Sequence, residues 1–296
     1  MRRSVAMRKI ILEVRCNEYA MRDGNPNVPW SPEEIGADAA ACREAGASML
    51  HFHARHPETG EVSHDVELYG ASIRRVRAAS DLLVMPTLGA YTIPDPRERA
   101  AHIPKLAADP ETRPDLAPVD LASTNIDPWI PGKGFLMEDL VYINTIEGIR
   151  AEMEMIAGSG VALDAVLWNV GSARILGALI EDGLWPEPAF TELVLANELL
   201  SVLPASELGL RTLHQFLPEG RDLVWTGLCL GSLFPMLESI LELGGHLAFG
   251  LGDNPFLELG SPTNAQVVAE VAKRVRGLGY EIATPAEARQ MLGLGS

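Results

Sequence analysis

Short apolar runs alternate with longer amphipathic segments along almost the whole chain, and this alternation limits the fold more than any other feature. The apolar runs have the length of strands, and the amphipathic segments have the length of helices. Strands are expected at 9–15, 48–54, 81–87, 118–124, 162–170, 189–196, 222–228 and 246–252. Helices are expected at 31–46, 64–80, 95–108, 146–159, 171–182, 204–217, 232–243 and 262–277. Eight strand–helix units in 296 residues predict an α/β fold of the (β/α)8 TIM barrel class.

The segment 31–46 illustrates how clearly the helices are marked. Ser31 is a good N-cap, Pro32 suits the first helical position, and Glu34 completes a capping box. A doubly wound open sheet is the rival fold, but no G-x-G-x-x-G motif follows the first expected strand. The segment 125–139 reads as a long loop, and we find no interdomain linker. A single barrel domain over residues 1–296 is therefore expected.

Composition excludes several classes of partner and site. The net charge is −16, and so acidic a surface repels nucleic acid and anionic membranes, neither of which is expected to bind. The three cysteines are odd in number and widely spaced, which is unlike a disulfide framework or a structural zinc site. No segment approaches the roughly 18 apolar residues of a membrane helix, nor does the N-terminus resemble a signal peptide. A cytoplasmic protein is expected.

A His-x-His pair lies in the second expected strand, in the sequence LHFHARH. Residues two apart in a strand share a face, so His51 and His53 are expected to point the same way. At the carboxyl end of a barrel strand that direction is the mouth of the barrel, where active sites lie. Two imidazoles there can bind one metal ion. The alternative is a pair of histidines held by hydrogen bonds in the core or at the surface.

The segment SPEEIGADAAACREAGASMLHFHAR resembles the β-keto acid cleavage enzyme family, which includes the 3-keto-5-aminohexanoate cleavage enzymes. The segments VDLAST, VYINTIEGIRAEMEMI, GGHLAFGLGDNPFL and GYEIATPAEARQMLG extend the resemblance in matching order. The resemblance implies a TIM barrel that forms a homo-oligomer, a dimer or a tetramer. It implies a divalent metal, most commonly zinc, and a reaction that condenses a β-keto acid with acetyl-CoA to give acetoacetate and a new acyl-CoA.

The resemblance also assigns roles to residues of this chain. It places the metal on His51 and His53, and catalytic carboxylates at Glu18 and Asp253, with Asp253 as the base. The candidates for substrate binding are Thr87, Ser123, Asn125 and Arg55. Each has a plainer reading: Glu18 as a solvated loop acid, Thr87 and Ser123 (or Thr124) as strand-end turn residues, and Arg55 as part of a surface ion pair.

Two positions of the last expected strand depart from the family. The family's arginine is replaced by Ala248, and its third metal ligand, a glutamate, by Gly252. Because catalytic zinc normally has three protein ligands, another carboxylate is needed. Three acids lie within plausible reach of the barrel mouth, namely Glu18, Glu192 and Asp253. Two other functions stay open: a metal-dependent lyase or hydrolase of a keto or hydroxy acid that needs no CoA, and a non-catalytic barrel that binds a metabolite.

Overall fold

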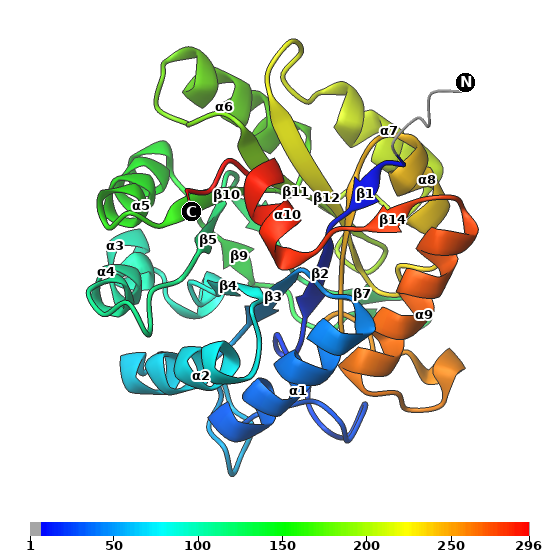
Figure 1. The fold of residues 1–296 in the computed structure, drawn as a ribbon. Coiled ribbons are helices and arrows are strands. Elements are labelled where there is room, and N and C mark those ends of the chain that lie inside the picture. The colour runs from blue at the N-terminus through cyan, green and yellow to red at the C-terminus, as the bar shows by residue number, and fades with distance from the viewer. Residues whose placement is uncertain (1–6, 296) are drawn as a thin grey trace, which may run out of the picture.

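A computed structural model describes residues 7–295, and its centre is a barrel of eight parallel strands (Figure 1). The strands are β2 (Leu12–Arg15), β3 (Met49–Phe52), β4 (Leu83–Pro86), β5 (Leu116–Asp120), β10 (Ala162–Leu167), β11 (Ala189–Ala196), β12 (Leu223–Leu230) and β13 (His246–Phe249). Their order is β4-β3-β2-β13-β12-β11-β10-β5. All eight correspond to strands expected from the sequence, so the predicted barrel is confirmed.

Asp115 joins the two strands at the ends of that order. Its backbone N–H donates to the carbonyl of Val84 at 2.9 Å, and its carboxylate accepts from the N–H of Val84 at 2.9 Å. A side chain thus replaces part of the ladder between β4 and β5, and the barrel is nearly closed.

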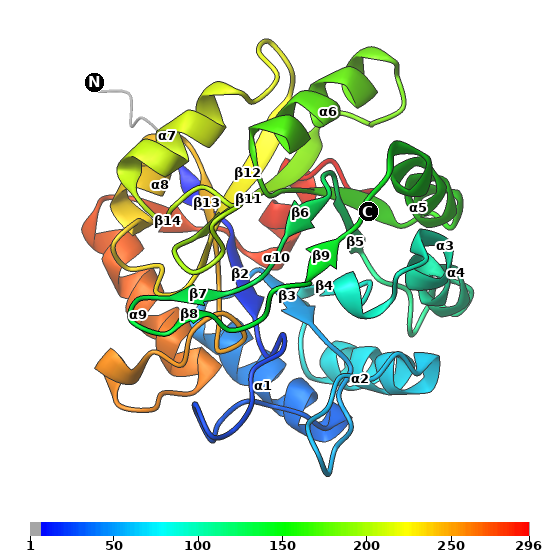
Figure 2. The same ribbon diagram turned by 180° about the vertical axis from the view of Figure 1, so that it is seen from behind.

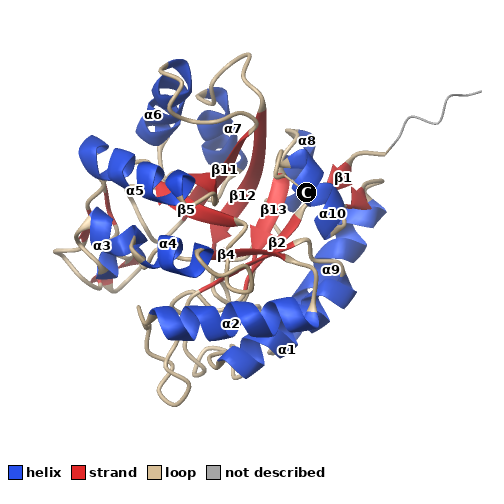
Figure 3. Cartoon of the chain, turned by 60° about the vertical axis from the view of Figure 1, so that its left-hand side comes forward, coloured by secondary structure: helices blue, strands red, loops and turns tan. Residues whose placement is uncertain are grey.

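Helices surround the strands on the outside of the barrel (Figure 3). They are α1 (Pro32–Ala45), α2 (Val66–Ala79), α3 (Pro96–Ala100), α4 (His102–Ala107), α5 (Ile146–Gly158), α6 (Val170–Glu181), α7 (Glu207–Gln215), α8 (Leu237–Glu242), α9 (Asn264–Gly277) and α10 (Pro285–Met291). The capping box predicted for 31–46 is present, with Ser31 accepting from the N–H of Glu34. Within the described residues, none of these helices has both the length and the apolar character needed to cross a membrane.

Two features close the amino-terminal end of the barrel, and neither was expected from the sequence. Strand β1 (Lys9–Ile10) pairs in parallel with β14 (Glu281–Ile282), and α10 lies across the barrel opening in Figure 1. Ala288 of α10 belongs to the same buried apolar cluster as Met49 and Leu83, which point into the barrel. The cluster seals this end, so the barrel is accessible from the other.

The segment 125–139, expected to be a loop, contains short paired strands. β6 (Thr124–Asn125) pairs with β9 (Val141–Tyr142), and β7 (Trp129–Ile130) pairs with β8 (Gly134–Phe135). Figure 2 shows these four strands in front of the barrel, on the side opposite α10. A bridge between Pro128 and Leu199 and a 2.8 Å hydrogen bond from Trp129 N–H to the Glu198 carbonyl tie the segment to the loop after β11.

Alternation along β2 divides its residues between two environments. Leu12 and Val14 belong to the apolar cluster between strands and helices. Glu13 and Arg15 have the opposite orientation and point into the barrel. The next strand in sequence, β3, places His51 beside Arg15 in the register of the sheet. The apolar face of each strand thus fixes which polar side chains enter the barrel.

Gly250, directly after β13, allows β13 to approach β2 closely. A Cβ atom at this position would lie 2.0 Å from the backbone oxygen of Arg15. Because backbone cannot move aside cheaply, Gly250→Ala is expected to lower the free energy of unfolding by about 3 kcal/mol or more. Denaturant titration measures the change.

Gly277→Ala at the end of α9 is the matched control, because a Cβ atom there would meet no neighbouring heavy atom within 4 Å. It should leave stability unchanged or raise it by up to about 1 kcal/mol. Equal stability of the two variants would contradict the close approach of β13 and β2.

Candidate metal centre and active site

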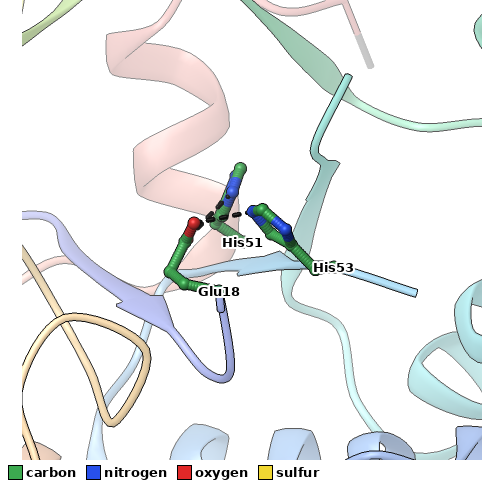
Figure 4. Close-up of side chains that lie close together, drawn as sticks. All are labelled: Glu18, His51 and His53. Carbon is green, nitrogen blue, oxygen red and sulfur yellow. Dashed lines mark ion pairs between the residues drawn. The ribbon is translucent and has the colours of Figure 1, made fainter. Parts of the chain in front are cut away.

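His51 and His53 both point into the mouth of the barrel and face the carboxylate of Glu18 (Figure 4). The Nε2 atom of His51 lies 3.1 Å from one oxygen of Glu18, and the Nε2 atom of His53 lies 2.6 Å from the other. The two histidines are 2% and 1% exposed. One atom from each of the three side chains, within 4.8 Å of the others, can serve as a metal ligand.

The loop after β2 that carries Glu18 is held in place from two sides. The side chain of Asn17 accepts from the N–H of His53 at 2.8 Å and donates to the carbonyl of His53 at 2.9 Å. The guanidinium of Arg55 donates to the backbone carbonyls of Asn17, Glu18 and Ala20. Glu18 itself has a φ of 34°, a conformation uncommon outside glycine and asparagine. These contacts fix the loop so that the Glu18 carboxylate faces both imidazoles.

These contacts place Arg55 differently from the expected role in substrate binding. Its side chain is 2% exposed, it also donates to the carbonyl of Gly60, and it is not among the residues that line the cavity. Backbone carbonyls take up its hydrogen-bonding groups, so Arg55 holds the Glu18 loop and is directed away from the cavity.

Gly252 explains how Glu18 fits beside the histidines. A Cβ atom at position 252 would lie 2.4 Å from Cγ and 2.8 Å from Cβ of Glu18. The Glu18 side chain therefore occupies the space into which a side chain at 252 would extend. Of the three acids considered as a third ligand, Glu18 is the one that shares a metal-capable group with the histidines in the described part of the chain.

Arg15, at the end of β2, is a central residue of the site that the sequence analysis missed. Its guanidinium lies 3.0 Å from Glu18, 3.2 Å from Glu192 and 3.3 Å from Asp253. Glu13 lies 3.7 Å away, deeper in the barrel. The sequence contained a signal for this residue, because Glu13 and Arg15 are two charged residues on one face of an otherwise apolar strand.

Arg15 also provides a cation near the position where the family pattern has one. Ala248 of β13 pairs with Glu13 in the sheet register and has no side chain beyond Cβ. The cation at the mouth therefore comes from β2, the neighbouring strand, and it binds Glu192 through both carboxylate oxygens. Glu192 and Asp253 are therefore paired with Arg15. Glu18 also lies beside Arg15, and its two oxygens face the histidines.

The charges of the site shift the pKa values of its members in opposite directions. Burial favours the neutral form of Glu18, but Arg15 and the two histidines outweigh it and hold the pKa of Glu18 well below its usual value. Burial raises the pKa of Asp253 well above its usual value, although Arg15 acts against this. Burial also favours neutral Arg15, yet the surrounding carboxylates raise its pKa. The shifts favour the anionic form of Glu18, and they make ionised Asp253 a stronger proton acceptor than an ordinary aspartate.

A cavity of about 300 Å³ opens at this point, lined by the three metal-capable residues and by Arg15, Thr87 and Asp253, among others. Thr87 is 4% exposed, and its hydroxyl accepts from the N–H of Gly89 at 3.2 Å. One carboxylate oxygen of Asp253 has no hydrogen-bond partner. The structure thus brings both expected carboxylates, the histidine pair and Thr87 to one cavity.

The structure does not bring Ser123 and Asn125 to this cavity. Ser123 is exposed, and its hydroxyl accepts from the N–H of Asn144 at 2.8 Å. Asn125 is also exposed and pairs with Val141 in the β6–β9 ladder. The expected strand ran to 124, but β5 ends at Asp120, so both residues fall beyond the mouth. Neither residue lines the cavity, and we withdraw the substrate-binding assignment for both.

Asp120, which the sequence analysis did not select, lines the cavity at the end of β5. Its carboxylate accepts from the hydroxyl of Tyr142 at 2.6 Å and from the indole N–H of Trp168 at 2.5 Å. The signal was present in the sequence VDLAST, where Asp120 is an acid inside an apolar run.

Comparison with known proteins agrees with this geometry. The chain is similar to a 3-keto-5-aminohexanoate cleavage enzyme of Fusobacterium nucleatum, with 27% identity over 97% of this chain and 99% of that one. It is 25% identical to a 3,5-dioxohexanoate:acetyl-CoA acetone transferase of Paraburkholderia graminis, over 91% of this chain and 90% of that one.

Among solved structures, the apo structure of ObcA has the same fold. Its TM-score is 0.73 at 18% identity, over 92% of this chain and 66% of the ObcA chain. The family model described as beta-keto acid cleavage enzyme matches residues 9–294, and the chain therefore belongs to the β-keto acid cleavage enzyme family, whose members act on β-keto acids.

Proposed function

We propose that this enzyme cleaves a β-keto acid with acetyl-CoA, giving acetoacetate and a new acyl-CoA. The C2–C3 bond of the acid breaks, and C2 bonds to the acetyl carbon. The CoA sulfur leaves the acetyl group and bonds to the acyl carbon that was C3, so atoms balance without an oxidant or reductant. The observation that carries the proposal is the Glu18–His51–His53 group, which opens into the same cavity as Asp253.

We propose that Glu18, His51 and His53 hold a divalent cation, with zinc as the preferred metal. Two histidines and a glutamate are a ligand set of catalytic zinc sites. The Nε2 atoms of both histidines face the two oxygens of Glu18, at 3.1 Å and 2.6 Å, which supports a cation held between the three side chains. When bound, such a cation polarises the keto group of the substrate as a Lewis acid.

Three residues of the protein have the other proposed roles, which are proton transfer, positioning of the base and binding of the substrate carboxylate. Asp253 accepts a proton from C2 of the acid at the carboxylate oxygen that has no hydrogen-bond partner among the described residues, and it returns the proton to C2 when the C2–C3 bond breaks. Arg15 positions Asp253 through the hydrogen bond from its Nε atom, 3.3 Å long. The hydroxyl of Thr87, which accepts from Gly89, retains its own hydrogen to donate to the substrate carboxylate.

Removing one ligand tests the metal centre. Glu18→Gln and His51→Ala are each expected to weaken zinc binding on the order of 100-fold or more, because only two protein ligands remain. Gly252→Ala should weaken binding as well, although it removes no ligand, because its Cβ atom would displace Glu18. Metal analysis and competition with a chelating dye measure the affinity.

Glu33→Gln, an exposed acid of α1, is the control and should bind zinc as the unaltered protein does. Unchanged affinity in Glu18→Gln would show that the third ligand is another residue.

Substitution of the base tests the reaction. Asp253→Asn is expected to lower kcat about 100- to 10,000-fold, because the amide cannot accept the proton, with metal content unchanged. Acetoacetate formation from a panel of β-keto acids and acetyl-CoA measures turnover. Asp182→Asn, at the exposed end of α6, is the control.

Omission of acetyl-CoA separates the proposal from the CoA-independent alternative. No product should form without it, and product formation in its absence would favour a lyase or hydrolase. Absence of turnover with every acid by zinc-loaded protein would defeat the proposed reaction.

We propose further that the protein is a homo-oligomer in the cytoplasm. Support for the oligomer comes from apolar side chains between 46% and 56% exposed near the barrel mouth, namely Phe135, Leu136, Met137, Val141, Ile143 and Ile146. Support for the compartment comes from the three buried cysteines, none of which is in a disulfide.

A Leu136→Asp/Ile143→Asp variant is expected to have a smaller molar mass in solution, measured by light scattering after size-exclusion chromatography. Charge in these positions would have to be buried on association. Leu208→Asp, on the exposed face of α7, should leave the mass unchanged. A mass that is the same in all three proteins would contradict this surface as the interface.

A further inference from the structure

The cavity has two unlike halves. One half contains the ionisable groups of β2, β3 and the loops after β2 and β13, together with Glu192 of β11, which is paired with Arg15. The other half is a separate apolar cluster on β10, β11 and β12, distinct from the two clusters that form the core of the molecule. Six of its members line the cavity, namely Val166, Trp168, Val194, Leu199, Leu228 and Leu230.

The segment that covers this apolar half is apolar too. The segment from β6 to β9 (residues 124–142), called the β6–β9 segment below, lines the cavity with four apolar residues, namely Ile126, Pro128, Met137 and Leu140. The bridge between Pro128 and Leu199 holds the segment against the cluster. A group that extends from the metal centre toward β11 and β12 therefore meets hydrocarbon on the strands and on the segment above them.

No free cation faces this half of the cavity. Arg15 is the one lysine or arginine that lines the cavity in the described chain, and it is surrounded by Glu18, Glu192 and Asp253. A second carboxylate at the far end of a substrate would be buried without a partner, among groups that already carry negative charge. Burial of an unpaired charge is strongly unfavourable.

Asp120 does not provide a free anion for a cationic substrate. Its two oxygens already accept from Tyr142 and Trp168, and Arg99 donates to the Tyr142 hydroxyl at 3.0 Å behind it. The guanidinium of Arg99 also lies over the Tyr142 ring, 4.8 Å from its centroid, so that aromatic face is taken. An ammonium group in the apolar half would therefore find neither Asp120 nor this ring free, and Glu192, the acid on β11, is already bonded to Arg15 through both oxygens.

We infer that the β-keto acid of this enzyme carries an uncharged, aliphatic acyl group, which binds between the Val166–Val194–Leu228–Leu230 wall and the β6–β9 segment. The inference rests on the proposed function, since it names the substrate class of the same site. The cavity of about 300 Å³ is at the small end of ligand pockets, so the acyl group is short.

Three acids with six-carbon chains test the inference: 3-oxohexanoate, 3-oxoadipate with a terminal carboxylate, and 5-amino-3-oxohexanoate with an ammonium group. The zinc-loaded protein is assayed with acetyl-CoA and each acid. The neutral acid should have the highest kcat/KM, by about 100-fold or more, because each charged chain buries an unpaired charge. Equal values for the three acids, or a preference for a charged one, would overturn the inference and leave the proposed reaction intact.

A substitution in the Val166–Val194–Leu228–Leu230 wall tests whether this wall determines the preference for an uncharged acid. Leu230 is half-buried at the end of β12, so an arginine there can fold with its charge near the cavity. Leu230→Arg should reverse the preference between 3-oxohexanoate and 3-oxoadipate. Leu208→Arg, the same exchange at a side chain that is 77% exposed on α7, should keep the preference of the unaltered protein. An unchanged preference in folded Leu230→Arg protein would count against the wall.

Binding separates this inference from the proposed reaction. If no acid is turned over, the reaction fails, and calorimetric titration of the three acids into zinc-loaded protein still decides the substrate class. Tighter binding of 3-oxohexanoate supports the aliphatic site. Equal affinities, tighter binding of a charged acid, or no binding of any acid would overturn it.

Discussion

The guanidinium of Arg15 is the contact on which the rest of the site depends. It lies within 3.7 Å of four carboxylates, from Glu13, Glu18, Glu192 and Asp253, in the interior of a barrel where isolated charge is costly. Burial raises the pKa of Glu13 and Asp253, and Arg15 acts against this rise, whereas Arg15 and the histidines hold the pKa of Glu18 below its usual value. Arg15 leaves one oxygen of Asp253 without a partner and leaves Glu18 directed at the histidines.

The last strand departs from the family pattern at Gly252 and Ala248, and the structure places other groups beside both positions. The Glu18 side chain fills the space next to Gly252, where a Cβ atom would lie 2.4 Å from its Cγ atom. Ala248 pairs with Glu13 in the sheet register, and the cation at the barrel mouth is Arg15 of the neighbouring strand β2. These contacts keep an acid beside the histidines and a cation beside the acids in a chain that lacks the two family side chains.

The sequence predicted the barrel and the histidine pair well, because both depend on local periodicity. Apolar alternation marked every barrel strand, and the spacing of His51 and His53 placed them on one face. It could not show which of Glu18, Glu192 and Asp253 lies beside the histidines, because that depends on a loop conformation fixed by Asn17 and Arg55. The surroundings of Arg55 were hidden for the same reason, since adjacency to the histidines in sequence does not reveal that its side chain turns to the backbone of the Glu18 loop. Ser123 and Asn125 lie outside the cavity because β5 ends at Asp120, four residues before the expected strand end.

The anchoring of the β6–β9 segment to the loop after β11 has a consequence for how this enzyme can diverge. In the proposed reaction, the bond-breaking groups come from β2, β3 and the loops after β2 and β13, whereas the surfaces that would enclose the acyl chain come from β10, β11, β12 and the tethered segment. Replacements in the second set can alter which acid is accepted without moving a metal ligand. The residues for substrate specificity and those for bond breaking thus lie on opposite sides of one barrel. Substitutions that change specificity can therefore accumulate while the proposed catalytic residues stay the same.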